Sequence, residues 1–129
     1  MPLYQISTRE PLNPKVKADV AMMITDVHCK HTGAPRTFVN VMFVNRVPLS
    51  PATDLHVFGS VRGGRTLQTN DNVEEDMVAQ LAALTGVDLR KIEFMIFPIP
   101  ASHVMEGGVV LPEPGEEASW LEQHHHAAE

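Results

Sequence analysis

A pattern typical of a strand, then a helix, then a second strand occurs two times along the chain. This repetition constrains the fold more than any other feature. The first unit covers residues 2–46 and the second covers residues 55–99. Crossovers between parallel strands are almost always right-handed, so both units would share one sheet with both helices on the same face. The sequence therefore predicts an α+β fold, a two-layer sandwich of tandem β-α-β units, in a single domain over 1–129.

The first unit has clear start and stop signals. Residues 2–8 alternate as a short strand does, and Asn13 is placed to cap a helix that begins at Pro14. Gly33 ends that helix, and residues 38–45 form the clearest strand pattern of the chain.

The second unit restarts the pattern. A strand is predicted over 55–61, followed by a helix that Asn70 or Asp71 could cap and that Gly86 ends. Residues 92–99 are almost wholly apolar and predict the last strand of the sheet.

One face of this sheet would have no helix over it. We expect that face to carry apolar side chains, and self-association is the simplest way to cover them. The residues expected there are Val41, Phe43, Phe94 and Ile96 or their neighbours.

The segment 100–129 follows the second unit. Residues 100–114 hold a Glu-Gly-Gly turn between short apolar stretches and predict a hairpin or lid. Beyond Gly115 the chain is acidic and polar, so we expect a solvated tail, and we interpret the triplet 124–126 as part of that tail rather than as a metal site.

Charge and composition exclude several function classes. Ten Lys and Arg against sixteen Asp and Glu give a net charge of -6, which disfavours nucleic acid and anionic membrane as partners. The single cysteine, Cys29, excludes an internal disulfide, and no metal-binding, Ser-His-Asp or bilayer-spanning pattern occurs. We expect a cytoplasmic protein without metal or cofactor.

Proline directly follows the initiator methionine, whose removal would leave a secondary amine at the start of the first strand. A free α-amine titrates at about 7.7 to 8.0, and burial or neighbouring cations lower its pKa toward neutrality. Pro2 is therefore a candidate for proton transfer. A small residue there can also serve N-terminal processing alone, so both interpretations stay open.

Four further side chains are candidates. Arg62 and Arg65 flank two glycines and could aim two guanidinium groups at one small anion, or could belong to a solvated turn. His28 lies at the border of the apolar face of its helix, and Glu106 precedes two glycines. Each of these two could be catalytic or merely structural.

Taken together, these motifs resemble the cis-3-chloroacrylic acid dehalogenase group of the tautomerase superfamily, over residues 2 to about 121. The motifs that carry the resemblance are Pro2 opening a strand, Leu12-Asn13-Pro14, Thr25-Asp26-Val27-His28, Thr32-Gly33, Arg62-Gly63-Gly64-Arg65, Glu106-Gly107, Leu111-Pro112-Glu113-Pro114-Gly115 and Trp120. The resemblance implies a trimer whose subunits are similar in architecture to macrophage migration inhibitory factor.

The resemblance also implies roles for single residues. Pro2 would be the amine that transfers protons, Arg62 and Arg65 would hold the substrate carboxylate, and His28 with Glu106 would orient and activate water. Tyr4 matches a tyrosine beside the proline.

Three pocket positions depart from the family pattern. Met95 stands where the family has a strand tyrosine, Ala34 where it has a threonine, and Phe38 where it has a leucine. We therefore expect a tautomerase acting on a small enolisable or unsaturated carboxylate, with low-level hydratase or dehalogenase activity. Two alternatives remain: a dedicated cis-3-haloacrylic acid dehalogenase or hydratase, and a non-catalytic trimeric interaction protein.

Overall fold

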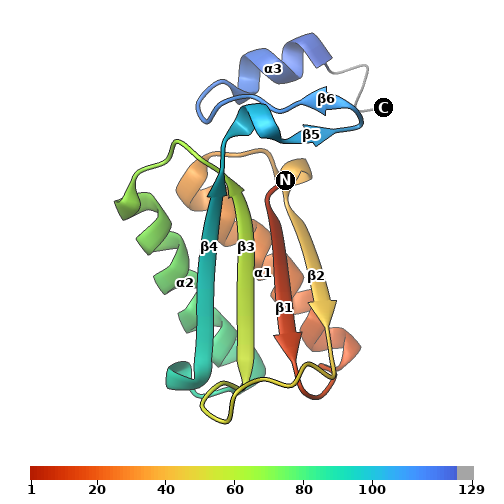
Figure 1. Cartoon of the computed structure of the whole chain (residues 1–129), viewed down its shortest axis with the longest axis vertical. Helices are drawn as coiled ribbons and strands as arrows, with labels where there is room; N and C mark the ends of the chain where they lie inside the picture. The colour runs from red at the N-terminus through yellow and green to blue at the C-terminus, as the bar shows by residue number, and fades with distance from the viewer. Residues whose placement is uncertain (125–129) are drawn as a thin grey trace.

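A four-stranded mixed sheet forms the centre of the computed structural model, which describes residues 1–124. The strand order is β2-β1-β3-β4, with parallel pairing inside each β-α-β unit and antiparallel pairing between β1 and β3 (Figure 1). The bounds are β1 Leu3–Thr8, β2 Asn40–Val44, β3 Leu55–Arg62 and β4 Ile92–Ile99. The α+β two-layer architecture predicted from the tandem pattern is confirmed.

Helix α1 (Pro14–Thr32) begins and ends as the sequence predicts. The Asn13 side chain accepts a hydrogen bond of 2.8 Å from the Val16 N–H, and Pro14 occupies the first turn. Gly33 adopts a left-handed conformation with φ 73° and closes the C-terminus, which a residue without Cβ does at little strain.

Helix α2 (Leu67–Thr85) ends at Gly86 as predicted, but the predicted cap is wrong. Thr66 caps the helix through its hydroxyl, so Asn70 and Asp71 lie inside the first turns. A threonine hydroxyl offers the same kind of acceptor as Asn or Asp, and starting at Thr66 lets the helix follow directly from the turn after β3.

The start predicted for the second strand also needs correction. Residues Arg36–Phe38 form a short 3-10 helix, and β2 begins only at Asn40. Phe38 is buried outside the sheet because this turn directs its ring toward the end of the molecule that carries the C-terminal segment.

The core lies between the sheet and the two helices. Tyr4 and Ile6 of β1 are buried there, and their neighbours on β2 by register are Val41 and Phe43. All four side chains therefore point toward the helices.

The assignment of Val41, Phe43, Phe94 and Ile96 to the uncovered face is consequently wrong, since all four pack against the buried core. Strand side chains alternate with period two, so the uncovered face carries the residues one position away. Met42, Met95 and Phe97 are the exposed large apolar residues at those positions.

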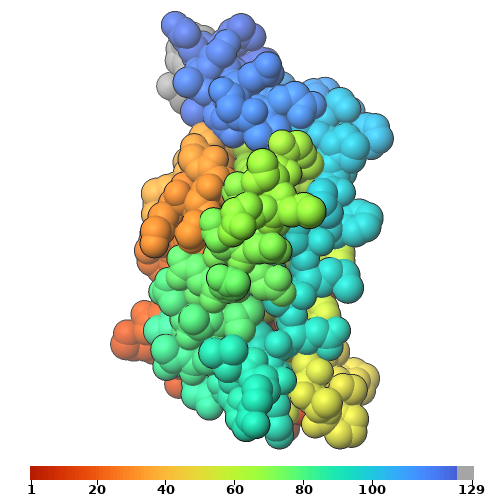
Figure 2. Space-filling model, turned by 90° about the vertical axis from the view of Figure 1, so that its left-hand side faces the viewer, coloured from red at the N-terminus to blue at the C-terminus, as the bar shows by residue number. Residues whose placement is uncertain are grey.

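The C-terminal segment lies across one end of the sheet (Figures 1 and 2). The predicted hairpin consists of β5 (Met105–Glu106) and β6 (Val109–Val110). The segment predicted as a solvated tail instead contains a helix, α3 (Glu117–His124), while residues 125 and 126 of the histidine triplet lie outside the described residues. The polar composition of α3 concealed it, and two of the side chains that anchor the helix to the rest of the chain are Glu117 and Trp120.

Within residues 1–124, no helix is both long and apolar enough to cross a bilayer.

Candidate active site

Four parts of the chain meet at the end of the sheet that α3 covers. Strand β1 starts there and β3 ends there because the two strands are antiparallel. Helix α1 ends at the same place, since it connects the parallel strands β1 and β2, and the β5-β6 hairpin lies above it (Figure 1). This topology brings the regions of Pro2, His28, Arg62 and Glu106 to one end of the molecule.

His28 is 1% exposed and is held by Tyr4. The Tyr4 hydroxyl lies 2.8 Å from His28 Nδ1, and the two rings make an edge contact with centroids 5.6 Å apart. Burial raises the pKa of Tyr4, so its phenol keeps its proton and is the donor to Nδ1. That bond leaves the ring proton on Nε2, which has no hydrogen-bond partner among the described residues.

The pKa of His28 is lowered to about 3 by burial, and further by the positive charges of Arg65, Arg62 and the amino terminus. The imidazole is therefore neutral at physiological pH and presents an N–H donor at Nε2.

Gly59 makes room for the Tyr4 ring. It pairs with Tyr4 across β1 and β3, and a Cβ on Gly59 would lie 2.6 Å from Tyr4 Cε1. Only glycine lets the phenol pack this close to the strand, and the phenol in turn orients His28. Sequence analysis missed Gly59, whose signal was a single glycine within an otherwise clear strand pattern.

Arg62 ends β3, and its guanidinium is fully buried. Both Nη groups and one face have partners, whereas Nε has no hydrogen-bond partner among the described residues. Nη1 donates to the Pro112 carbonyl at 2.6 Å, and Nη2 donates to Glu117 Oε1 at 2.9 Å. The guanidinium carbon lies 5.4 Å from the centroid of the Phe38 ring, in cation-π geometry.

Glu117 was also missed by the sequence analysis. Its Oε2 accepts from the Gly115 N–H at 2.8 Å, and the hydrogen bonds from Arg62 and the backbone outweigh burial and lower its pKa. No sequence motif marks Glu117. The sequence indicated only that an arginine at the end of a buried strand would need a carboxylate partner somewhere in the chain.

Arg65 is bound differently. Its Nη1 donates to the Arg62 carbonyl at 3.0 Å, while Nε and Nη2 are buried and have no partner among residues 1–124. Burial and the neighbouring Arg62 charge lower its pKa below the usual arginine value, but a guanidinium stays charged at neutral pH. Arg65 therefore offers two desolvated charged donors.

The amino terminus lies beside these groups. Pro2 is fully buried, and the amine of Met1 lies against the Glu106 carboxylate, with which it pairs when it is protonated. Burial, and secondarily the charge of Arg62, lowers the pKa of this amine to about 6. An amine at this end of β1 is thus largely neutral at pH 7 and can accept a proton.

A cavity of about 300 Å³ adjoins these groups, between the hairpin, the turn before β2, and α3. It is lined by Thr37, Phe38, Glu106, Gly107, Val109, Trp120 and His124. Glu106 is the one carboxylate among these lining residues, and Phe38 and Trp120 provide an apolar wall in which their rings meet edge to face at 5.6 Å.

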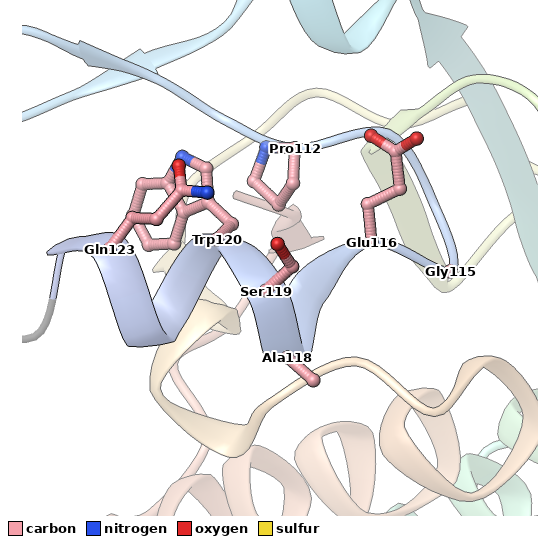
Figure 3. Close-up of a pocket in the computed structure, with 7 residues that line it drawn as sticks. All are labelled: Pro112, Gly115, Glu116, Ala118, Ser119, Trp120 and Gln123. Carbon is pink, nitrogen blue, oxygen red and sulfur yellow. The ribbon is translucent and has the colours of Figure 1, made fainter.

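A second cavity of about 550 Å³ lies along α3 and the segment before it (Figure 3). It is lined by Pro112, Gly115, Glu116, Ala118, Ser119, Trp120 and Gln123. None of the catalytic and carboxylate-binding residues predicted from the sequence lines this cavity, whereas Glu106 lines the smaller one. The smaller cavity is therefore the better candidate for substrate.

The predicted pocket residues Ala34 and Met95 lie in different places, the first near the site and the second away from it. Ala34 is buried just after the end of α1, near the site. Met95 lies midway along the edge strand β4, pairs with Phe58 and is 47% exposed on the uncovered face, so it does not join the site within one chain. Within the described part of the chain, no group of three or more His, Cys, Asp or Glu is placed to hold a metal ion.

The model of a family described as "Tautomerase_3: Putative oxalocrotonate tautomerase enzyme" matches residues 1–125. No curated protein matches significantly in sequence.

Among solved structures, N1, a member of the cis-3-chloroacrylic acid dehalogenase family, is 27% identical with a TM-score of 0.87, covering 94% of this chain and 91% of N1. The native Ps01740 structure is 28% identical with a TM-score of 0.74, covering 81% of this chain and 100% of its own. An asymmetric trimer of a fused 4-OT, F6, is 19% identical with a TM-score of 0.77, covering 84% of this chain and 95% of its own, and shares the fold.

Proposed function

Because the chain belongs to the Tautomerase_3 family, whose model matches almost its entire length, we propose that it transfers protons on a small enolisable or unsaturated carboxylate through an amine at Pro2. The observation that carries the proposal is a cluster of buried donors, next to the amino terminus, that have no partner among residues 1–124. These donors are Arg62 Nε, Arg65 Nε and Nη2, and His28 Nε2. Such donors favour an anionic ligand, since leaving them unpaired is unfavourable.

The carboxylate would bind to the arginines. Arg65 supplies charged donors that are already desolvated, and Arg62 adds positive charge nearby. Donors fixed before the reaction can stabilise the enolate charge that develops when a proton leaves the carbon beside a carbonyl.

Pro2 would act as the base. Removal of Met1 would expose a prolyl amine one residue from the position where the Met1 amine now has a pKa of about 6. The same burial and the same Arg62 charge would act on the prolyl amine, so we expect it to be substantially neutral at pH 7. Keto-enol tautomerisation requires this neutral form.

A second reaction is supported by Glu106. This carboxylate lies against the amine and lines the cavity, so it could take a proton from a water that the Nε2–H of His28 orients. The water oxygen would add to an unsaturated or 3-halo acid while a protonated Pro2 supplies the proton to the neighbouring carbon. Membership of N1 in the dehalogenase family supports this alternative. Methionine at position 95 has no phenol to assist, so hydration or dehalogenation would be the weaker activity.

The active form would be a homotrimer. The fused 4-OT relatives are described as trimers, and the uncovered sheet face gives this chain an apolar surface for the same assembly. A trimer would bring residues of that face, Met95 among them, close to the site of a neighbouring subunit.

Retention of Met1 tests the role of Pro2. We expect a protein that keeps Met1 to lose phenylenolpyruvate tautomerisation, because the proline nitrogen is then an amide without a basic lone pair. Intact-mass measurement establishes the N-terminus, and the enol-to-keto conversion is followed in the same samples.

The Pro2→Ala variant with Met1 removed is the matched control, since it keeps a primary amine and should retain part of the activity. Full activity in Pro2→Ala with Met1 still attached would overturn the proposed role. Loss of all catalysis in every form, with anion binding intact, would favour the non-catalytic alternative.

A further inference from the structure

The smaller cavity of the candidate site has a wall of aromatic rings that contact one another. Phe38 and Trp120 meet edge to face with centroids 5.6 Å apart, and the His124 ring stacks on Trp120 with centroids 4.6 Å apart. All three rings line the cavity of about 300 Å³. The indole N–H of Trp120 already donates to the Val110 carbonyl at 2.8 Å, so this wall suits a planar apolar group.

His124 differs from the other two rings because one of its nitrogens can bind a ligand. Its Nδ1 lies 2.8 Å from the Trp120 carbonyl oxygen, which can only accept, so Nδ1 carries the proton. In the neutral ring Nε2 then keeps its lone pair, and no residue within 1–124 forms a hydrogen bond to it. His28 is the reverse case, since the Tyr4 hydroxyl donates to its Nδ1 and leaves a donor at Nε2. His124 therefore offers an acceptor that matches a hydroxyl.

The length of α3 indicates how long a ligand must be to use both ends of this region. Glu117, the first residue of α3, bonds to Arg62, and His124 is the last residue of the same helix. At 1.5 Å per residue, these two ends of α3 lie about 10 Å apart. A three-carbon acid spans only roughly 4 Å, because each of its C–C bonds is about 1.5 Å long. A ligand held at the arginines therefore needs a longer body to reach His124.

We propose that the site binds an elongated, planar carboxylic acid with a hydroxyl at its far end, and that His124 is the residue that selects this hydroxyl. The carboxylate would lie at the arginines, an apolar body of aryl size would lie along Phe38 and Trp120, and the hydroxyl would donate to His124 Nε2. Glu106 lines the same cavity beside the amine, so the body would pass the group that transfers protons. This inference rests on the proposed carboxylate-binding function and names its substrate class, a hydroxyaryl acid.

Three acids that share one head group test the proposal: acrylate, trans-cinnamate and trans-4-hydroxycinnamate. We expect cinnamate to bind at least about tenfold more tightly than acrylate, because its ring buries apolar area against the wall. The hydroxyl should add about fivefold, the effect of one net hydrogen bond, and trans-4-methoxycinnamate should lack this gain because it has no donor. Calorimetry measures all four affinities without catalysis. Cinnamate binding no more tightly than acrylate would overturn the proposal.

The His124→Phe variant keeps a ring beside Trp120 and removes the acceptor. The affinity ratio of 4-hydroxycinnamate to cinnamate should fall to about 1, while the ratio of cinnamate to acrylate keeps its wild-type value. Gln123→Ala is the matched control and should change neither ratio, since Gln123 is the exposed neighbour on α3 and lines the larger cavity (Figure 3). A hydroxyl gain that persisted in His124→Phe would mean that another group accepts this bond, and the assignment would be wrong.

The Val109→Phe variant tests the cavity without a change in α3. Val109 lies on β6 and lines the cavity, so a phenyl group there would occupy space that the ligand body needs. Cinnamate affinity should fall about tenfold or more, and acrylate affinity should change by less than about twofold. Val110→Phe is the control, because Val110 is 44% exposed and does not line the cavity. Equal effects of Val109→Phe on both acids would place the cinnamate ring elsewhere, which the proposal forbids.

A failure of the proposed function would give a different result. Arg65→Gln should weaken the binding of acrylate, cinnamate and 4-hydroxycinnamate alike, by about tenfold or more, if the arginines hold the carboxylate. Unchanged affinities in Arg65→Gln would contradict the carboxylate site and this inference with it. The expected loss in Arg65→Gln without a preference for cinnamate over acrylate would contradict the substrate class alone.

Discussion

At the scale of single residues, the site depends on polar groups that are buried before any ligand arrives. His28 is kept neutral by its surroundings, because burial and the cations of Arg65 and Arg62 all disfavour its protonation. The Tyr4 hydroxyl then fixes the tautomer by bonding to Nδ1. Burying a neutral histidine makes folding sensitive to pH, and this sensitivity can be measured.

We predict that His28 destabilises the protein in mild acid. Its pKa is about 3 in the fold and ordinarily about 6.5, so below pH 6.5 the unfolded chain binds a proton that the native chain does not. Stability therefore decreases as the pH is lowered, by roughly 1.4 kcal/mol from this residue between pH 7.5 and pH 5.5. Urea unfolding at a fixed protein concentration, compared between wild type and His28→Gln, measures the difference.

The exposed His103 provides the comparison for this experiment, and His103→Gln should keep the wild-type dependence on pH. If His28→Gln also kept that dependence, the buried imidazole would not be the group responsible.

At the scale of elements, the packing of β3 against β1 holds the site in shape. A Cβ at Gly59 would lie 2.6 Å and 2.8 Å from two atoms of the Tyr4 ring, which is closer than packed atoms approach. The ring would have to move, and the bond to His28 would move with it.

We therefore predict that Gly59→Ala destabilises the protein by about 1 to 3 kcal/mol, the usual range for overpacking, and also reduces activity. Thermal or denaturant unfolding and the tautomerase assay test the two effects together. Ser60→Ala, on the next residue of β3 and the opposite face of the sheet, should change neither. A Gly59→Ala protein of wild-type stability would mean that the strand yields without strain.

Local patterns predicted the elements well where their causes are local. The cap at Asn13, the end at Gly33 and the strand alternation depend on neighbours a few residues away, and the structure has each of them. The beginning of α2 was placed too late because Thr66, Asn70 and Asp71 are all acceptable caps, and the choice depends on the turn after β3.

Long-range contacts explain what the sequence did not predict. Alternation determines which strand residues share a face but not which face the helices cover, so Val41 and Phe94 were placed on the wrong side. Helix α3 is stabilised by contacts of Glu117 with Arg62 and of Trp120 with Phe38, across 55 residues in the first case. The candidate site residues were identified from sequence motifs and from the resemblance to a family, and their roles remain predictions. These residues are Pro2, His28, Arg62, Arg65 and Glu106.

At the scale of the whole molecule, the uncovered face of the sheet is the feature without a partner. Its large apolar residues are Leu3, Met42, Phe58, Met95 and Phe97, and the rings of Phe58 and Phe97 stack with centroids 6.2 Å apart. No element within residues 1–124 packs over this face. An apolar surface of this kind, on a chain of net charge -6, is typical of an interface between copies.

We predict that the double substitution Met95→Lys with Phe97→Lys prevents trimer formation, because two ammonium groups would have to be desolvated in the interface. Both side chains are exposed in the single chain, 47% and 54%, so the fold itself should tolerate the change. Light scattering should give about three times 14.2 kDa for the wild type and a smaller mass for the variant. Leu67→Lys, at an 83% exposed position of α2, should leave the mass unchanged. If the Met95 and Phe97 variant kept the full mass, a different surface would form the assembly, and Met95 would lose its proposed place beside a neighbouring site.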